Sequence, residues 1–158
     1  LIKAGAKPAK IGEAVYANYP WSRIELMRRV LDTVKRDASG RIATLRQTIE
    51  MKRMSEAVDG DNNGFVNIPL AAKEVLAAVY MREVGEGEYR VSLRSKGDIN
   101  IARVAERFGG GGHKNAAGLR ISGNWDEKES EIVEAVRRAI ESSEDDLSAN
   151  GSNGHQSK

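Results

Sequence analysis

Residues 89–122 of the chain are YRVSLRSKGDINIARVAERFGGGGHKNAAGLRIS, and the order of elements in this stretch indicates the fold. The segments 89–93 and 117–122 have the alternating, β-branched pattern of strands. Between them, apolar residues recur at helical spacing, and Asp98 or Asn100 is expected to cap that helix at its start. A helix placed between two strands and followed by a glycine run favours an α+β fold.

The sequence upstream of this stretch adds further strands. Gly85 and Gly87 predict a hairpin with a three-residue loop, so the segment before them pairs with 89–93. We therefore expect a mixed sheet of about five strands with flanking helices, preceded by connector helices. The other predicted elements are strands over 41–46, 65–68 and 75–84, and a short helix capped by Thr48.

Both ends of the chain differ from this central part. A short helix is predicted over 9–18, and Ser22 with Glu25 forms the pattern of a capping box that opens a second helix running to Arg36. Residues 126–142 have the spacing of an amphipathic acidic helix. The sequence beyond it is polar and is expected to be disordered. The predicted limits are 1–40 for connector helices, 41–142 for the domain and 143–158 for the tail.

Composition limits the class of protein. The chain has no cysteine, which excludes disulfides and thiolate metal sites and fits the cytoplasm, the expected location. No apolar run approaches the roughly 20 residues that span a bilayer, so no membrane partner is expected. The net charge is +2, but 21 basic and 14 acidic residues precede residue 126. That part is expected to face an anionic partner. Because the chain begins with Leu1, we infer a fragment of a longer protein.

Four consecutive glycines, Gly109–Gly112, are followed by His113, Lys114 and Asn115. A folded protein retains such a run where φ is positive or where a ligand approaches the backbone, since ordering glycines costs entropy. Successive amides in such a turn favour anions. The run is not a Walker loop, because no Ser or Thr follows the lysine, and not a dinucleotide fingerprint, because a helix precedes it. The alternative is a flexible helix cap and linker.

Arg94 and Ser95 end the predicted strand that precedes the glycine-bearing helix. A guanidinium can bind two phosphate oxygens at once, and a serine beside it adds a hydroxyl while leaving room for the phosphate. The alternative is an edge-strand arginine engaged in a surface ion pair. On these residues alone, both interpretations stay open.

Together, residues 91–102 (VSLRSKGDINIA) and 108–118 (FGGGGHKNAAG) resemble the DHH-associated domain, which follows the catalytic domain in DHH phosphoesterases. The two segments are most similar to the nano-RNase and pAp phosphatase branch of that family. The resemblance extends over about residues 59–123. Residues 1–36 resemble, less specifically, the end of the catalytic DHH domain and its connecting helices.

The resemblance implies that the full-length protein is a hydrolase. In the family, Mn²⁺ ions bound by Asp and His side chains of the N-terminal domain activate water. This chain has no D-H-H motif, so we expect neither a metal site nor a catalytic residue in it, with His113 as a stabiliser of phosphate charge. Asp59 and Asp61 are assigned to a Gly/Asn loop. The substrate-binding residues implied are Arg94, Ser95, Gly109, Gly110, Gly111, Gly112, His113, Lys114 and Asn115.

The partners implied are short RNA or DNA, pAp or dinucleotides, and the protein's own N-terminal DHH domain; whether cyclic dinucleotides are substrates stays open. A homodimer is expected for the full-length protein, and the isolated chain is expected to be inactive. Two alternatives remain. One is a non-catalytic nucleic-acid-binding module, like the related domain at the end of alanyl-tRNA synthetases. The other is an interaction domain that binds a partner through the acidic helix at 126–142.

Overall fold

The computed structural model describes residues 7, 10 and 18–151, and a six-stranded mixed sheet forms its centre. Neighbouring strands are antiparallel, except β2 and β3, which are parallel. The α+β class and mixed sheet predicted from the sequence are therefore confirmed. In sheet order the strands are β1 (Lys35–Arg36), β2 (Ile42–Gln47), β3 (Ala77–Gly85), β4 (Glu88–Ser95), β6 (Ala116–Ser122) and β5 (Gly111–His113).

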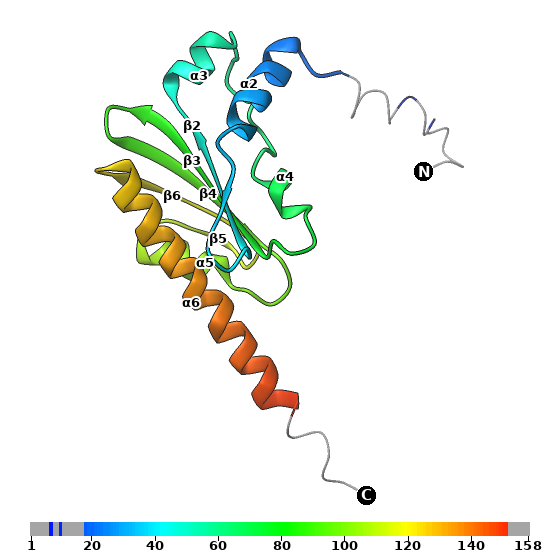
Figure 1. Ribbon diagram of the computed structural model, residues 1–158, viewed down its shortest axis with the longest axis vertical. Helices are drawn as coiled ribbons and strands as arrows, with labels where there is room; N and C mark the ends of the chain where they lie inside the picture. The colour runs from blue at the N-terminus through cyan, green and yellow to red at the C-terminus, as the bar shows by residue number, and fades with distance from the viewer. Residues whose placement is uncertain (1–6, 8–9, 11–17, 152–158) are drawn as a thin grey trace, which may run out of the picture.

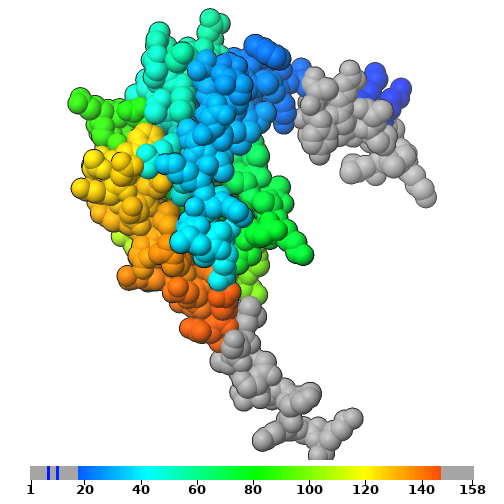
Figure 2. Space-filling view, in the orientation of Figure 1, coloured from blue at the N-terminus to red at the C-terminus, as the bar shows by residue number. Residues whose placement is uncertain are grey.

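Helices cover the two faces of this sheet as separate layers (Figure 1). One layer consists of α5 (Ile101–Arg107) and α6 (Trp125–Gly151). The other consists of α2 (Trp21–Leu31), α3 (Ile49–Met54) and α4 (Asn67–Leu70). In the space-filling view, the yellow-to-orange α6 runs along one flank of the molecule, beside the blue and cyan surface of α2 and the β1–β2 turn (Figure 2). None of the described helices has the length and apolar character that crossing a membrane requires.

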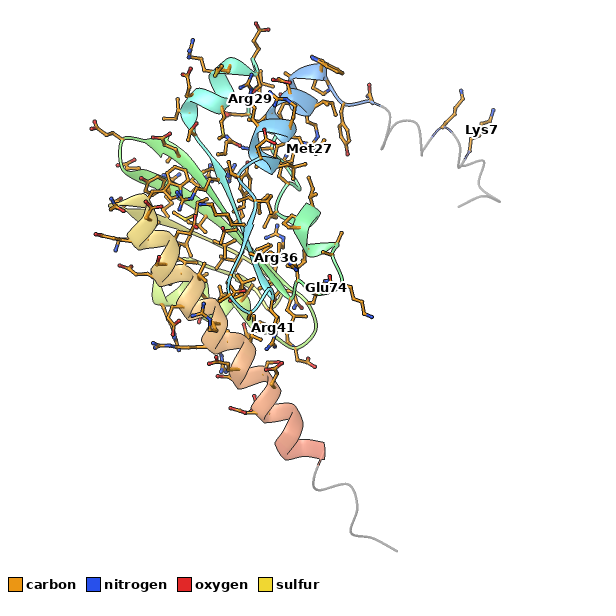
Figure 3. All side chains as sticks on the ribbon, in the orientation of Figure 1. Lys7, Met27, Arg29, Arg36, Arg41 and Glu74 are labelled. Carbon is orange, nitrogen blue, oxygen red and sulfur yellow. The ribbon has the colours of Figure 1, made fainter. Side chains whose placement is uncertain are left out.

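Side chains that alternate along β3 divide the interior into two cores. Val79 faces a cluster that includes Ile132 and Val136 of α6, whereas Tyr80 faces a cluster with Leu26 of α2. Met27 of α2 packs against this second cluster as well (Figure 3). The second layer packs on β2 and β3 and contacts β4 through α4. On the same face, Arg90 of β4 and Arg120 of β6 are exposed, and Arg94 of β4 is half-buried.

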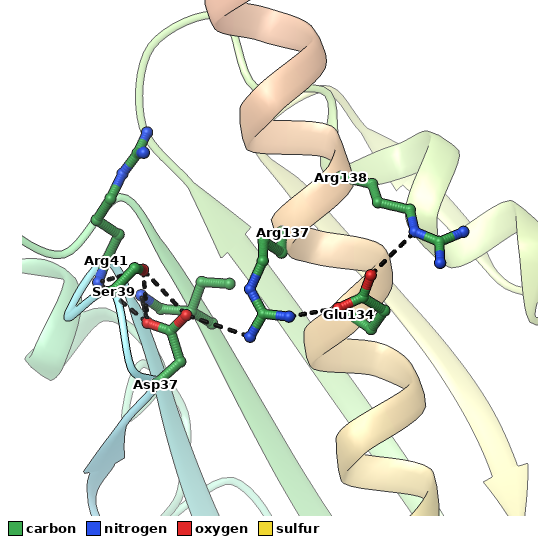
Figure 4. Close-up of polar contacts among 7 residues, drawn as sticks. Asp37, Ser39, Arg41, Glu134, Arg137 and Arg138 are labelled. Carbon is green, nitrogen blue, oxygen red and sulfur yellow. Dashed lines mark hydrogen bonds and ion pairs between the residues drawn. The ribbon is translucent and has the colours of Figure 1, made fainter.

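Asp37 connects the β1–β2 turn to α6 (Figure 4). Its carboxylate accepts hydrogen bonds from the backbone N–H of Ile42 at 3.1 Å, from the Ser39 hydroxyl at 2.9 Å and from Arg137 at 3.4 Å. The Asp37 side chain is only 5% exposed. Burial alone would raise the pKa of Asp37, but the hydrogen bonds outweigh it, so the pKa lies below its ordinary value. The ionised carboxylate is thus the form that holds the turn against the helix.

Most of the predicted elements are present. The strands predicted over 41–46, 75–84, 89–93 and 117–122 correspond to β2, β3, β4 and β6. Thr48 caps α3, since its side chain accepts a hydrogen bond from the backbone N–H of Met51 at 3.1 Å. Asn100, and not Asp98, caps α5, and it accepts from the backbone N–H of Arg103 at 3.4 Å. Sequence periodicity therefore located these elements to within about two residues.

Four local predictions were wrong. The hairpin loop has two residues, because Gly85 pairs directly with Glu88. Residues 65–68 form no strand: they turn into α4, and Phe65 is buried against Tyr80. Ser22 forms no capping box, since its hydroxyl donates to Asp61 at 3.0 Å. α2 ends at Leu31, because the chain then turns into β1 to pair with β2.

The C-terminal boundary also differs from the prediction. α6 continues to Gly151, so residues 143–151 are helical and not disordered. A helix that is anchored by buried Ile132, Val136 and Ile140 can extend further, because each added residue needs no new nucleation. Glu144 on this extension pairs with Arg41. The remaining tail, 152–158, and the helix predicted over 9–18, apart from residues 10 and 18, lie outside the described residues.

Candidate functional site

Arg94 and His113 lie on the same face of the sheet, on either side of Ala116. Arg94 of β4 pairs with Ala116 of β6, and His113 of β5 pairs with the same alanine from the other side. Directly opposite residues in antiparallel strands project from one face, so both side chains emerge beside a small methyl group. Arg94 is half-buried, and its Nη1 donates to the carbonyl of Leu93 at 2.9 Å. Within the described part of the chain Arg94 has no ion-pair partner, so its charge is free to bind an anion.

The glycine run leads from the end of α5 to the edge strand β5. Gly109 adopts a positive φ of 74°, which ends the helix in the way that glycine favours. Gly110 and Gly112 press their backbones against β6: a Cβ on Gly110 would overlap the carbonyl oxygen of Gly118, and one on Gly112 would overlap that of Ala116. Both positions therefore need glycine for packing. A Cβ on Gly111 would meet nothing within 4 Å.

Hydrogen bonds of Ser95 and Asn115 connect the segment that follows β4 to the turn between β5 and β6, and we refer to this network as the clasp. The buried Ser95 hydroxyl donates to the carbonyl of Ile99 at 2.9 Å and accepts from the side-chain amide of Asn115 at 3.1 Å. Asn115 also donates to the carbonyl of Gly97 at 3.0 Å. The only hydrogen that the Ser95 hydroxyl can donate is thus used inside the protein, and the residue is buried next to Arg94. Its predicted role as a direct substrate ligand has no support from this geometry.

Lys114 belongs to the same clasp. Its ammonium group contacts Asp98 at 2.5 Å, and its carbonyl accepts from the backbone N–H of Ile101 at 2.7 Å. The hydrogen bond from Lys114 lowers the pKa of Asp98 and explains why this carboxylate does not cap α5. Both side chains are exposed, so their ion pair contributes little stability by itself. The clasp therefore positions the start of α5 against the end of the glycine loop.

Three further arginines, Arg82, Arg90 and Arg120, project from the same face of the sheet as Arg94 and were missed from the sequence. They occupy β3, β4 and β6 and pair directly across the sheet. Arg90 and Arg120 each lie between two apolar residues in the sequence, a pattern that indicates an outward-facing side chain. Only the register of three strands brings them into one row, and a single sequence does not give that register.

The described residues offer no cluster suited to a metal ion: they contain no group of three or more His, Cys, Asp or Glu side chains that could hold one. Asp61 is buried and accepts hydrogen bonds from Ser22 and from the backbone N–H of Val58, each at 3.0 Å. Asp59 pairs with Lys52 at 2.5 Å. Asp61 therefore stabilises the local loop, whereas the ion pair of the exposed Asp59 contributes little stability by itself.

This chain belongs to the DHHA1 domain family, whose model matches residues 37–142. The resemblance to DHH phosphoesterases noted from the sequence motifs is thereby confirmed. The match begins directly after β1 and covers strands β2 to β6 and most of α6.

Named relatives of the chain are phosphoesterases. It is 29% identical over 141 residues to a bifunctional oligoribonuclease and PAP phosphatase NrnA from Thermus thermophilus, covering 89% of this chain and 41% of that protein. It is 34% identical over 73 residues to a cyclic-di-AMP phosphodiesterase GdpP from Geobacillus thermodenitrificans, covering 46% of this chain and 11% of that protein. The chain thus spans less than half the length of these relatives.

A solved structure shares the same fold. An exopolyphosphatase-related protein from Bacteroides fragilis superimposes with a TM-score of 0.82 and 33% identity, over 90% of this chain and 42% of that one. A pGpG-specific phosphodiesterase, PggH, from Vibrio matches with a TM-score of 0.53 at 13% identity, over 75% of this chain and 39% of that one, which shows similarity of fold alone.

Proposed function

We propose that this chain is the substrate-binding part of a manganese-dependent phosphoesterase and that it clamps the phosphates of short nucleic acids or nucleotides. The observation that carries this proposal is the pairing of Arg94 and His113 across Ala116, next to the unobstructed Gly111. A guanidinium binds phosphate through two parallel hydrogen bonds, and an imidazole beside it adds a further donor. Phosphate binding at this point agrees with relatives named as oligoribonuclease and PAP phosphatase.

Hydrolysis needs groups that the described residues do not supply. A two-metal phosphoesterase brings several carboxylates and imidazoles together around ions about 3.5–4 Å apart. No such group exists among the residues that the structure describes. We assign the manganese ions to an N-terminal DHH domain that closes over the substrate from the opposite side. In that arrangement His113 stabilises negative charge on the bound phosphate.

The test is a titration of the 158-residue chain with pAp and with a dinucleotide, followed by backbone amide NMR. We expect shifts at Arg94 and from Gly109 to His113. The affinity should be weak, because the chain forms one side of the site, and it should fall with added salt, because charge dominates the contact.

The matched control is Arg103→Ala, which removes the same charge from α5 on the opposite face of the sheet. This variant should bind pAp like the unchanged chain. If the glycine loop stays unshifted while residues of α6 move, the acidic-helix interaction is the better interpretation and the proposal is wrong.

A further inference from the structure

Arg82, Arg90 and Arg120 form a row across β3, β4 and β6. Arg90 pairs with Arg82 on one side and with Arg120 on the other, so the three side chains leave the same face of the sheet. This face is the one that carries Arg94. Arg90 and Arg120 are exposed, whereas Arg82 is half-buried. We refer to these three residues as the arginine row.

The arginine row is electrostatically unfavourable without an anion. Like charges directly opposite one another destabilise a sheet. Across the described residues, no member of the row forms an ion pair, although the charge of Asp59 acts on Arg82 and Arg90 while its carboxylate bonds Lys52. Burial lowers the pKa of Arg82, and the charge of Arg90 lowers it further. Such an arrangement is typical of a site that receives negative charge from a ligand.

Arg82 is held in place by its surroundings. Its Nη1 donates to the side-chain carbonyl of Asn62 at 3.3 Å, and its guanidinium lies 5.7 Å from the centre of the Tyr80 ring. The Nε of Arg82 is buried and has no hydrogen-bond partner within the described structure. Arg82 therefore presents a positioned charge at one end of the row, beside the two exposed arginines.

A surface hollow of about 380 Å³ joins the arginine row to the glycine loop. All three arginines line it, together with Gly109, Gly110 and Gly118. Between the arginine row and Arg94, the paired residues are Ser92, Gly118 and Gly111, which carry almost no side-chain atoms. The floor between the two cationic positions is thus flat and unobstructed, and it suits a sugar or a base.

The arginine row lies too far from Arg94 to share its phosphate. Arg90 and Arg94 are four residues apart on β4, which corresponds to about 13 Å along a strand. Neighbouring phosphates of one nucleic-acid strand are closer together than this. A ligand that reaches both positions must therefore carry at least one further phosphate between the two that are bound, whereas the two phosphates of pAp flank a single nucleoside.

We propose that the arginine row binds a second phosphate of a single-stranded oligonucleotide whose first phosphate lies at Arg94 and His113. This inference rests on the proposed function and adds a length preference to it. Oligonucleotides with three or more consecutive phosphates, such as a tetranucleotide, use both positions. A nucleotide such as pAp uses only the first.

The experiment compares the binding of pAp and of a single-stranded RNA tetranucleotide to three forms of the 158-residue chain. The test variant is Arg90→Ala with Arg120→Ala. The matched control is Arg103→Ala with Arg107→Ala, which removes two exposed arginines from α5 on the other face. Amide spectra of each variant establish that the fold is retained.

We expect the test variant to bind the tetranucleotide about tenfold more weakly, since charge-assisted contacts are lost. The slope of its affinity against salt should decrease by roughly 0.7 for each phosphate contact removed. Its affinity for pAp should not change, and the control should bind both ligands like the unchanged chain. Equal weakening of both ligands, or no weakening of the tetranucleotide, overturns the inference.

The Arg94→Ala variant separates this result from a failure of the proposed function. Suppose that Arg94→Ala weakens the binding of pAp while the Arg90 and Arg120 substitutions leave the binding of the tetranucleotide unchanged. Then only the second phosphate position is wrong. If Arg94→Ala leaves pAp binding intact, the proposed phosphate clamp itself is wrong. The Arg90 and Arg120 variants then report a separate anion-binding surface.

Discussion

Gly111 and Gly118 lie opposite each other in the β5–β6 pair, and neither carries a side chain on the face shared with Arg94. A Cβ on Gly111 would meet no atom within 4 Å, whereas one on Gly118 would lie 3.2 Å from the carbonyl oxygen of Val91. The glycines of this region therefore have different roles. Gly118, Gly110 and Gly112 serve the packing of strands, and Gly111 leaves space for a ligand.

The first prediction follows from this difference. We expect Gly111→Val to abolish pAp binding while the chain stays folded, because valine suits an edge strand and fills only the open site. Gly112→Ala should instead destabilise the chain by at least about 1–3 kcal/mol, because its Cβ overlaps the backbone of β6. Urea unfolding and pAp titration of both variants check the prediction. A large loss of stability in Gly111→Val would contradict it.

Arg94→Ala should weaken pAp binding by about 1.5–3 kcal/mol, the range for a hydrogen bond to a charged group. Arg94→Lys should recover only part of the loss, since an ammonium group cannot form the two parallel bonds of a guanidinium. Calorimetric titration of the three forms measures both effects. Equal affinity of the lysine and arginine forms would indicate attraction by charge alone.

Ser95→Ala tests whether the serine positions the site or contacts the ligand. The substitution removes the hydroxyl that bonds the carbonyl of Ile99 and the side-chain amide of Asn115, so we expect a loss of about 1–3 kcal/mol in stability. The binding of pAp should weaken less than in Arg94→Ala. If stability is unchanged and binding is lost, Ser95 contacts the ligand directly after all.

The chain should become less stable at low pH through Asp37. Its pKa in the folded state lies below the ordinary value of 3.8, so the unfolded chain takes up the proton first. The stability that this carboxylate contributes is fully present above about pH 4 and is lost as the pH falls through the lowered pKa. Asp37→Asn should flatten this part of the curve of unfolding free energy against pH. An identical acid dependence in the variant would show that Asp37 is not responsible.

The isolated chain should hydrolyse neither pAp nor a dinucleotide, with or without added manganese, because no metal-binding group exists among its described residues. Activity should appear when an N-terminal DHH domain is supplied, and it should then depend on His113. The measurement is phosphate or nucleotide release by the repurified chain. Metal-dependent turnover that persists after repurification and is lost in His113→Ala would contradict this division of roles.

The sequence alone identified the family and most of the elements. Local patterns determine strands such as β4 and caps such as Thr48, because hydrophobic alternation and side-chain capping act within a few residues. The spacing of Arg94 and the glycine run from Gly109 sufficed to indicate the family, which the match over residues 37–142 then confirmed.

Only the tertiary structure decided which of these residues are available to a ligand and which stabilise the fold. Strand register brings His113 beside Arg94 and aligns Arg82, Arg90 and Arg120, and register depends on contacts between segments far apart in the sequence. Burial likewise separates Ser95, whose hydroxyl is used inside the protein, from Arg94, whose charge remains available at the surface. A sequence specifies which side chains are present, whereas long-range pairing of strands decides which of them meet at one site.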